Sequence, residues 1–321
     1  MRRIALINQK GGVGKTTTAV NLGAALAREG RRVVLVDLDP QANLTVHLGV
    51  EPPPAATTYD VLVDGRPIRE ALLSVPNLPG LSVLGTTLDL AGAELELAGT
   101  LGRETILRDA LETWIEEHRA ATGEDPADYV LYDCPPSLGL LSINALAATR
   151  EVFLCVQTEF FALQGMSKLV EVVGLVRRRL RLEIEITGIV ACLYDSRLKL
   201  AREVLAELRG HFDERVFRQP IGSNIKLAEA PSFGQSIFDY APDSNGARDY
   251  TALAREVIAQ EQPGSESADV PLAEVELTPT APQATGTPQT SAASQAAPAG
   301  GDAPHLGSGP TPEPGAGGPE A

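Results

Sequence analysis

The first 37 residues contain a strand, a glycine-rich loop, a helix and a second strand, and this order constrains the fold more than any other feature. Arg3–Asn8 is a short apolar run of strand length, and Arg32–Asp37 is another. Between them, apolar residues recur at helical spacing over Thr16–Glu29, and Gly30 is expected to end that helix. Nearly continuous apolar strands joined by a helix predict a βαβ unit of a parallel sheet covered on both faces.

The same alternation continues to about residue 260. Further strands are expected at Leu81–Leu84, Tyr129–Asp133, Val152–Val156 and Ile184–Leu193, and helices at Glu104–His118, Gly165–Leu180, Leu198–His211 and Ala247–Gln260. The predicted fold class is α/β, a doubly wound, mostly parallel sheet with helices on both faces. In such sheets ligands bind beyond the carboxyl ends of the strands.

The segment from Pro263 to Ala321 differs in composition from the rest. It has no Lys or Arg, seven acidic residues and 11 of the 24 prolines. Its few large apolar residues are isolated, so it buries too little surface to offset the entropy of ordering. We therefore expect one folded domain, residues 1–262, followed by a disordered acidic tail rich in Pro, Gly and Ala, residues 263–321.

Several classes of protein are excluded by composition. No run approaches the roughly 18 apolar residues of a membrane helix, and the apolar stretch after Met1 is too short for a signal peptide. Cys134, Cys155 and Cys192 follow or lie within strand-like runs and form no CxxC pair. We expect three buried thiols in a reducing compartment, without a disulfide, a zinc site or a metal cluster.

A phosphate-binding loop is the strongest functional signal. Small glycines let successive backbone N–H groups point at a phosphate, and the following helix adds its positive N-terminal end. Lys15 can reach the β and γ phosphate oxygens, and the Thr16 hydroxyl can ligate Mg²⁺. The nucleotide-binding residues are therefore expected in the run Lys10, Gly11, Gly12, Val13, Gly14, Lys15, Thr16 and Thr17.

Two further strands end in acidic residues. Asp37 and Asp39 follow the second strand, and Asp133 ends the strand Tyr129–Asp133. Carboxylates placed beside a phosphate loop can hold the water shell of Mg²⁺ or orient an attacking water. The sequence thus predicts a hydrolytic nucleotide site at this edge of the sheet.

The loop departs from a standard Walker A motif, because Gln9 stands where that motif has glycine and Lys10 adds a second lysine. It resembles the deviant Walker A motif of the ParA/MinD group of P-loop ATPases. The resemblance extends over about residues 1–260 to the chromosomal ParA (Soj) proteins, through the segments 90–97, 133–140, 194–197 and 227–234.

The resemblance implies a Mg-dependent ATPase that takes ATP/ADP and Mg²⁺ as cofactors. Lys10, Lys15 and Asp39 would be catalytic, with Lys10 reaching the nucleotide of the facing subunit and Asp39 orienting the attacking water. Asp133 would be the Walker B acid. Thr16, Asp37 and Asp133 would form the metal site. Asp37 would contact the residues that bind the metal and not the metal itself.

Chromosome partition is the function that the resemblance implies. ATP would close two subunits into a homodimer that binds double-stranded DNA nonspecifically on the nucleoid in the cytoplasm. A ParB-like centromere-binding partner would stimulate hydrolysis and release the dimer. The domain is acidic even without its tail, so DNA would need a local basic patch. Its expected members are Arg197, Lys199, Arg202 and Lys226, whereas the run Arg177–Arg181 suits either DNA or a solvated helix end.

One departure concerns the loop expected to contact adenine. The family usually has Ile-Pro-Arg-Asn there, and this chain has Ile221, Gly222, Ser223 and Asn224. Asn224 can still bind the base, while the loss of the proline is expected to loosen the loop.

Two other functions remain open. A ParA-like protein could segregate a plasmid or position another cargo. A MinD-like division-site regulator is disfavoured, because such proteins end in a basic amphipathic helix and this chain ends in an acidic, Pro/Gly-rich segment that gives no membrane binding of that kind.

Overall fold

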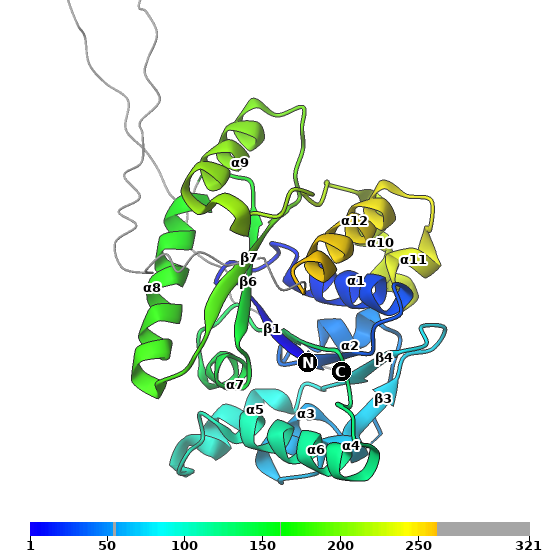
Figure 1. Cartoon of the computed structure of the whole chain (residues 1–321), viewed down its shortest axis with the longest axis vertical. Coiled ribbons are helices and arrows are strands. Elements are labelled where there is room, and N and C mark those ends of the chain that lie inside the picture. Colours follow the sequence, from blue (N-terminus) through cyan, green and yellow to red (C-terminus); the bar gives the residue numbers. More distant parts are fainter. Residues whose placement is uncertain (54–55, 161, 262–321) are drawn as a thin grey trace, which may run out of the picture. The chain divides into compact units, whose positions relative to one another are not determined.

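A computed structural model describes residues 1–53, 56–160 and 162–261 of the chain (Figure 1). The predicted tail lies outside the described residues. Among the residues described, every helix is too short or too polar to span a bilayer.

The core of the molecule is a seven-stranded sheet with the order β3-β4-β2-β5-β1-β6-β7. All neighbouring strands pair in parallel except β3, which runs antiparallel to β4 at one edge. This confirms the predicted α/β fold class. The strands are β1 (Arg2–Ile7), β2 (Val33–Asp37), β3 (Leu72–Ser74), β4 (Leu81–Leu84), β5 (Tyr129–Asp133), β6 (Glu151–Gln157) and β7 (Glu185–Cys192).

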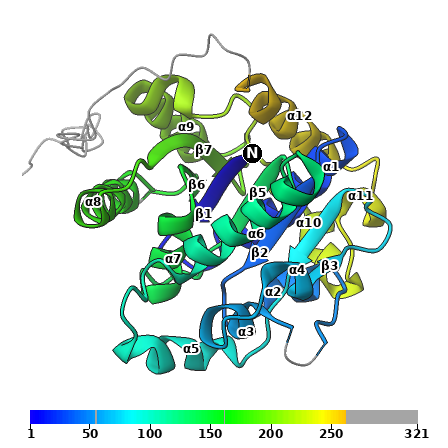
Figure 2. The same ribbon diagram turned by 60° about the horizontal axis from the view of Figure 1, so that its bottom comes forward.

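Helices cover both faces of the sheet, and Figure 2 shows α6 and α7 in front of it. One face is covered by α1 (Lys15–Arg28), α2 (Asn43–His47), α10 (Ile225–Glu229), α11 (Ile237–Tyr240) and α12 (Asn245–Ala259). The other is covered by α3 (Thr58–Val63), α4 (Ile68–Ala71), α5 (Leu90–Glu96), α6 (Ile106–Thr122), α7 (Leu140–Ala148), α8 (Ala162–Leu180) and α9 (Lys199–Phe212). Short 3₁₀ turns lie at Leu97–Gly99, Asp213–Arg215 and Ala230–Phe233.

Alternating strand residues separate the two faces of the core. In β1, Ile4 and Leu6 pack toward α1 and α12, whereas Ala5 and Ile7 pack toward α6 and α7. The helix α1 lies so close to β2 that a Cβ at Gly23 would stand 2.7 Å from a Leu35 methyl group. The predicted strands and main helices are all present, with ends shifted by a few residues.

The parallel register brings the functional residues to one edge. Asp37 at the end of β2 pairs directly with Asp133 at the end of β5. Strand β1 lies on the other side of β5 and leads into the glycine-rich loop. The loop and both strand-end acids therefore meet at the carboxyl edge of the sheet, as the sequence predicts.

Candidate nucleotide-binding site

The glycine-rich loop has the backbone that its sequence requires. Gly12 and Gly14 have φ values of 73° and 95°, which favour glycine. A Cβ at Gly11 or Gly12 would meet no protein atom within 4 Å. Protein packing therefore does not account for these two glycines, and the open space above them leaves room for a phosphate to approach the backbone.

Lys15 begins α1 directly after the loop, and its side chain is buried, with 6 % of the residue exposed. Within the described residues, its ammonium makes no hydrogen bond or ion pair. A buried cation without a bonded carboxylate at the N-terminus of a helix is a site for an anion. Thr16 follows in the first turn of the same helix.

Asp37 holds the loop that follows β2. Its carboxylate accepts hydrogen bonds from the Thr45 hydroxyl at 2.6 Å, the Thr45 N–H at 2.9 Å and the Asp39 N–H at 3.2 Å. Burial raises the pKa of Asp37 to about 6, against these hydrogen bonds, which lower it. Asp37 thus fixes the backbone of the loop that carries Asp39, whose own buried carboxylate accepts from the Gln41 N–H at 3.0 Å.

Asp133 is fully buried, and neither of its carboxylate oxygens has a hydrogen-bond partner among the described residues. Burial first, and then the negative charge of Asp37, raise its pKa to about 8, while Thr16 and Lys15 lower it. A buried carboxylate without a partner costs free energy unless a proton or a cation joins it.

These residues fit Mg²⁺. In the described ranges no three His, Cys, Asp or Glu side chains gather as a metal site. Mg²⁺ bound with a nucleotide needs only one or two protein oxygens, because phosphates and waters supply the rest. The unpartnered oxygens of Asp133 and the Thr16 hydroxyl next to Lys15 match that donor set.

Lys10 lies at the same edge but contacts its own subunit. Its ammonium pairs with Glu159 at 2.6 Å and donates to the Gln157 side chain at 3.0 Å, and its side chain is 57 % exposed. Both partners follow or end β6. The residue expected to cross to a facing subunit is thus accessible, and it would have to leave Glu159 to do so.

Two contacts of the site were not predicted from the sequence. Beneath the loop, a Cβ at Gly14 would stand 3.5 Å from Cys192, and the Thr18 hydroxyl contacts both Cys192 and Tyr250. The three cysteines are buried and free, as predicted.

The second is Glu94 on α5, which contacts the N-terminus of α7. Its carboxylate accepts from the Leu141 N–H at 3.3 Å, and a Cβ at Gly139 would stand 2.3 Å from its oxygen. Gly139 therefore lets a carboxylate approach a helix N-terminus that has no side-chain cap of its own. The segment between Asp133 and α7 is thus held at its far end by α5.

Asn224 caps α10 by accepting from the Lys226 N–H at 2.8 Å. The loop before it is well bonded, because Gly222 N–H donates to Asp249 at 3.0 Å and Ser223 N–H donates to the Tyr194 carbonyl at 3.0 Å. A proline at position 222 could not make the first bond. The structure therefore gives no sign of the loosening expected from the missing proline.

The residues proposed for DNA lie on two segments that adjoin at one point. Arg197 lies two residues before α9, Lys199 and Arg202 lie in its first turn, and Lys226 lies on α10. The two segments adjoin through the Tyr194–Gly222 bridge. Three of these cations are paired within the chain, Arg197 with Asp195, Lys199 with Glu203 and Lys226 with Glu229. They are exposed, with the Arg197 side chain at 87 %.

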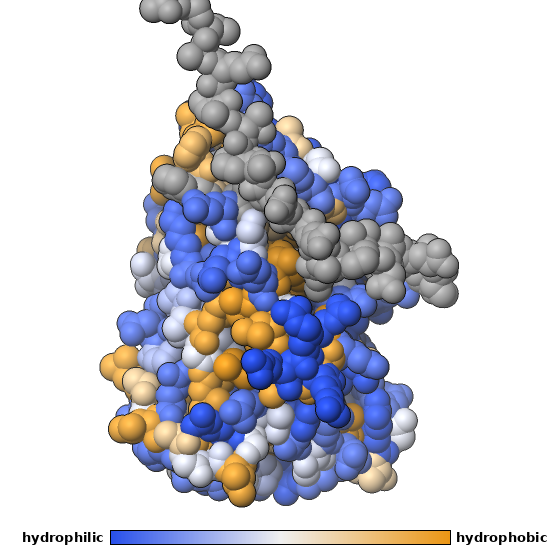
Figure 3. All heavy atoms as spheres, turned by 90° about the vertical axis from the view of Figure 1, so that its left-hand side faces the viewer, coloured by the Kyte–Doolittle hydropathy of each residue, from blue (hydrophilic) through white to orange (hydrophobic). Residues whose placement is uncertain are grey.

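The arginine run at 177–181 lies elsewhere. It ends α8 just before β7 begins, whereas α9 starts just after β7 ends. The eight residues of β7 span about 25 Å. The run therefore lies at the edge of the sheet where the parallel strands begin, opposite their carboxyl ends. Figure 3 shows the side of the molecule that bears α8, where strongly hydrophilic side chains lie beside exposed apolar ones.

Comparisons with known proteins agree with this geometry. Residues 1–186 match the family model described as an AAA domain. The chain is 48 % identical over 262 residues to the chromosome-partitioning ATPase Soj of Thermus thermophilus, covering 82 % of this chain and 97 % of Soj. It is 44 % identical over 263 residues to the chromosome partitioning protein ParA of Caulobacter vibrioides, covering 82 % and 96 %.

Solved structures with the same fold include nucleotide complexes. Cobyrinic acid a,c-diamide synthase from Mycobacterium smegmatis, with a bound ATP analogue and magnesium, is 34 % identical with a TM-score of 0.67, covering 81 % of this chain and 96 % of that one. The chain belongs to the ParA/Soj family of chromosome-partitioning ATPases.

Proposed function

We propose that this protein is a Mg-dependent ATPase that partitions DNA, as an ATP-bound dimer that binds DNA without sequence preference. The observation that carries the proposal is the pair of lysines around one glycine loop. Lys15 is buried in the loop and Lys10 is exposed at its rim. One can hold a nucleotide in its own subunit, and the other is free to turn toward a second subunit once it leaves Glu159.

The residues of the site have separate tasks in this proposal. The loop N–H groups and Lys15 bind the phosphates, and Asn224 contacts the base. Asp133 and Thr16 hold Mg²⁺, which neutralises the charge that develops on the transferred phosphate. Asp37 fixes the loop in which Asp39 orients the attacking water.

Dimerisation would couple the binding of ATP to the binding of DNA. A second subunit brings a second copy of Arg197, Lys199, Arg202 and Lys226, and two modest patches together release more counterions from DNA than one. Because ATP favours the dimer and the dimer binds DNA better, DNA must equally favour ATP binding. The names of the relatives support chromosomal DNA as the cargo. A ParB-like partner would trigger release from the nucleoid.

The proposal is tested by the mass of the protein in solution, measured by light scattering after gel filtration. With Mg·ATP, a hydrolysis-deficient Asp39→Ala variant is expected to elute as a dimer, and with Mg·ADP as a monomer. Adding Lys15→Ala should leave it monomeric in both. Identical masses with all nucleotides would overturn the proposal that ATP causes dimerisation. If the ATP-bound protein is a dimer but does not bind a DNA duplex, only the proposed DNA binding is overturned.

A further inference from the structure

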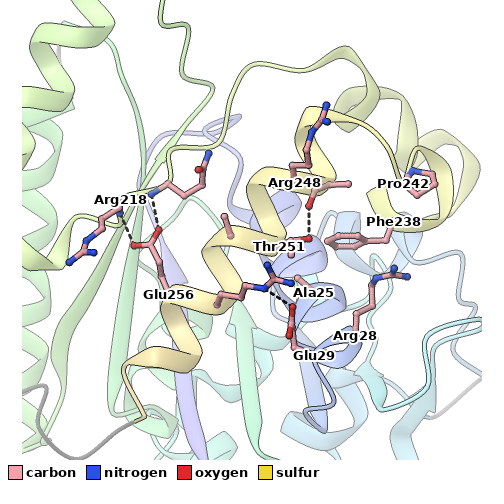
Figure 4. A pocket seen from close by; sticks show the side chains of 13 residues that line it. Ala25, Arg28, Glu29, Arg218, Phe238, Pro242, Arg248, Thr251 and Glu256 are labelled. Atoms are coloured by element: carbon pink, nitrogen blue, oxygen red, sulfur yellow. Dashed lines mark hydrogen bonds and ion pairs between the residues drawn. The ribbon is translucent and has the colours of Figure 1, made fainter.

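An open groove of about 850 Å³ lies on the α12 face, away from the glycine loop (Figure 4). Its walls come from the end of α1, from α12 and from the segments around Arg218 and Pro242. Figure 4 shows Arg218 and Glu256 at one end, and Arg28, Phe238 and Pro242 at the other. None of the residues of the nucleotide site lines it.

The groove has a net positive charge, because it is lined by four arginines and only two carboxylates. Its two carboxylates are already engaged, Glu29 by Arg255 at 2.9 Å and Glu256 by the N–H groups of Arg218 and Gln219 at 2.8 Å each. In the described part of the chain, Arg28, Arg218 and Arg248 form no ion pair with a carboxylate. Three arginines without a carboxylate partner therefore line the groove, and one of them, Arg248, donates to the Asn245 side chain at 2.7 Å.

The groove also has apolar walls. The Phe238 ring lies under the Arg28 guanidinium, 5.1 Å from ring centroid to the central carbon, and Ala25 and Pro242 lie beside it. Arginines beside an aromatic ring and small apolar side chains suit an extended acidic peptide that also carries aliphatic residues. A free inorganic anion would pair with the arginines but would make no apolar contact with the walls.

We propose that the groove binds the segment Asp269–Leu277 of the same chain. This segment, Asp-Val-Pro-Leu-Ala-Glu-Val-Glu-Leu, alternates acids with aliphatic residues. Although each stands singly between other residues, four of the five large aliphatic residues that follow Gln262 lie in this segment, with three of the seven acids. No lysine or arginine follows Arg255, so nothing in the segment opposes the charge of the groove.

The connection is long enough. The groove-lining part of α12 extends back from its end to Arg248, which is about 18 Å at 1.5 Å per helical residue. The seven residues between Glu261 and Asp269 can span about 23 Å when extended. Asp269 can therefore reach the far end of the groove, and a covalent tether raises the local concentration of the segment to the millimolar range.

The test is disulfide trapping in the full-length chain. Ala252 lines the groove and the three native thiols are buried, so Ala252→Cys with Ala273→Cys forms a single engineered pair. The matched control is Ala252→Cys with Ala292→Cys. For an undirected chain the shorter loop should close only about three times faster. With oxidised glutathione, we expect the disulfide to Ala273→Cys to form at least tenfold faster than the disulfide to Ala292→Cys. High salt should reduce this ratio of rates toward threefold.

Variants of the groove complete the test. Arg218→Ala with Arg248→Ala should remove the rate advantage, whereas Arg178→Ala with Arg179→Ala on α8 should keep it. A ratio near threefold that salt and the groove variants do not change would overturn the proposal. A disulfide that links two chains, seen as a dimer on a non-reducing gel, would overturn it in favour of a second copy as the occupant.

Discussion

Asp133 and Asp37 end neighbouring strands in direct register, and the carboxylate of Asp133 is buried without a hydrogen-bond partner in the described residues. Two adjacent buried acids at the carboxyl edge of the sheet are unfavourable when both are ionised. A bound cation or a proton relieves the repulsion. The arrangement therefore links protonation, metal binding and stability at one point.

The stability of the nucleotide-free protein should fall as pH rises from about 4 to about 8. The pKa values of Asp37 and Asp133 are raised to about 6 and about 8, so the folded state holds protons that the unfolded state has already lost. Each group contributes a slope of at most about 1.4 kcal/mol per pH unit within its window. Denaturant unfolding across this range should show a smaller slope for Asp133→Asn, and equal slopes in both proteins would refute the assignment.

Binding of Mg·ADP at pH 7 should release close to one proton, because the metal replaces the proton on Asp133. Calorimetry in two buffers with different ionisation enthalpies measures this number directly. Asp133→Asn should bind more weakly and release no proton. Release that persists unchanged in the variant would place the titrating group elsewhere.

Substitution of the two loop lysines should have different effects. Lys15→Ala should lose nucleotide binding, because the buried phosphate cation is gone. Lys10→Ala should still bind nucleotide as a monomer but lose dimer-dependent hydrolysis, by at least tenfold. Titration of a fluorescent ADP analogue separates the two, and loss of ADP binding in Lys10→Ala would contradict the division of roles.

Glu94→Ala should destabilise the protein by about 0.5–1 kcal/mol, because the N-terminus of α7 loses its carboxylate. Exchange of the Leu141 amide should become faster. The control is Glu96→Ala on the same helix, which loses only the exposed contact with the Tyr59 hydroxyl. Equal Leu141 exchange in both variants would remove the capping role.

Arg197→Glu should reduce DNA binding at least tenfold and leave nucleotide binding unchanged, since the arginine is exposed just before α9. Arg179→Glu makes the same charge change at the opposite edge of the sheet and is the matched control. Filter binding at low salt measures both. An equal loss in the two variants would indicate a general charge effect instead of a local patch.

The meeting of the glycine loop and the strand-end acids at one edge could be predicted because these elements are local in sequence. The loop has fixed glycine spacing, and strand-end acids reach the same edge whenever strands are parallel. The edge strand β3 could not be predicted, because its three residues are half-buried or exposed and show no clear alternation of apolar and polar side chains. The contacts of Lys10 with Glu159, Glu94 with Leu141 and Gly222 with Asp249 join residues 27 to 149 positions apart, and only the folded topology brings them together.

The central claim is that ATP controls attachment to DNA, and retention on a nonspecific DNA duplex measures it most directly. The full-length protein is applied with Mg·ATP, Mg·ADP or no nucleotide, and then with a ParB-like partner added. We predict retention with Mg·ATP alone, and its loss when the partner stimulates hydrolysis. Retention that is equal in all three nucleotide states would contradict the account.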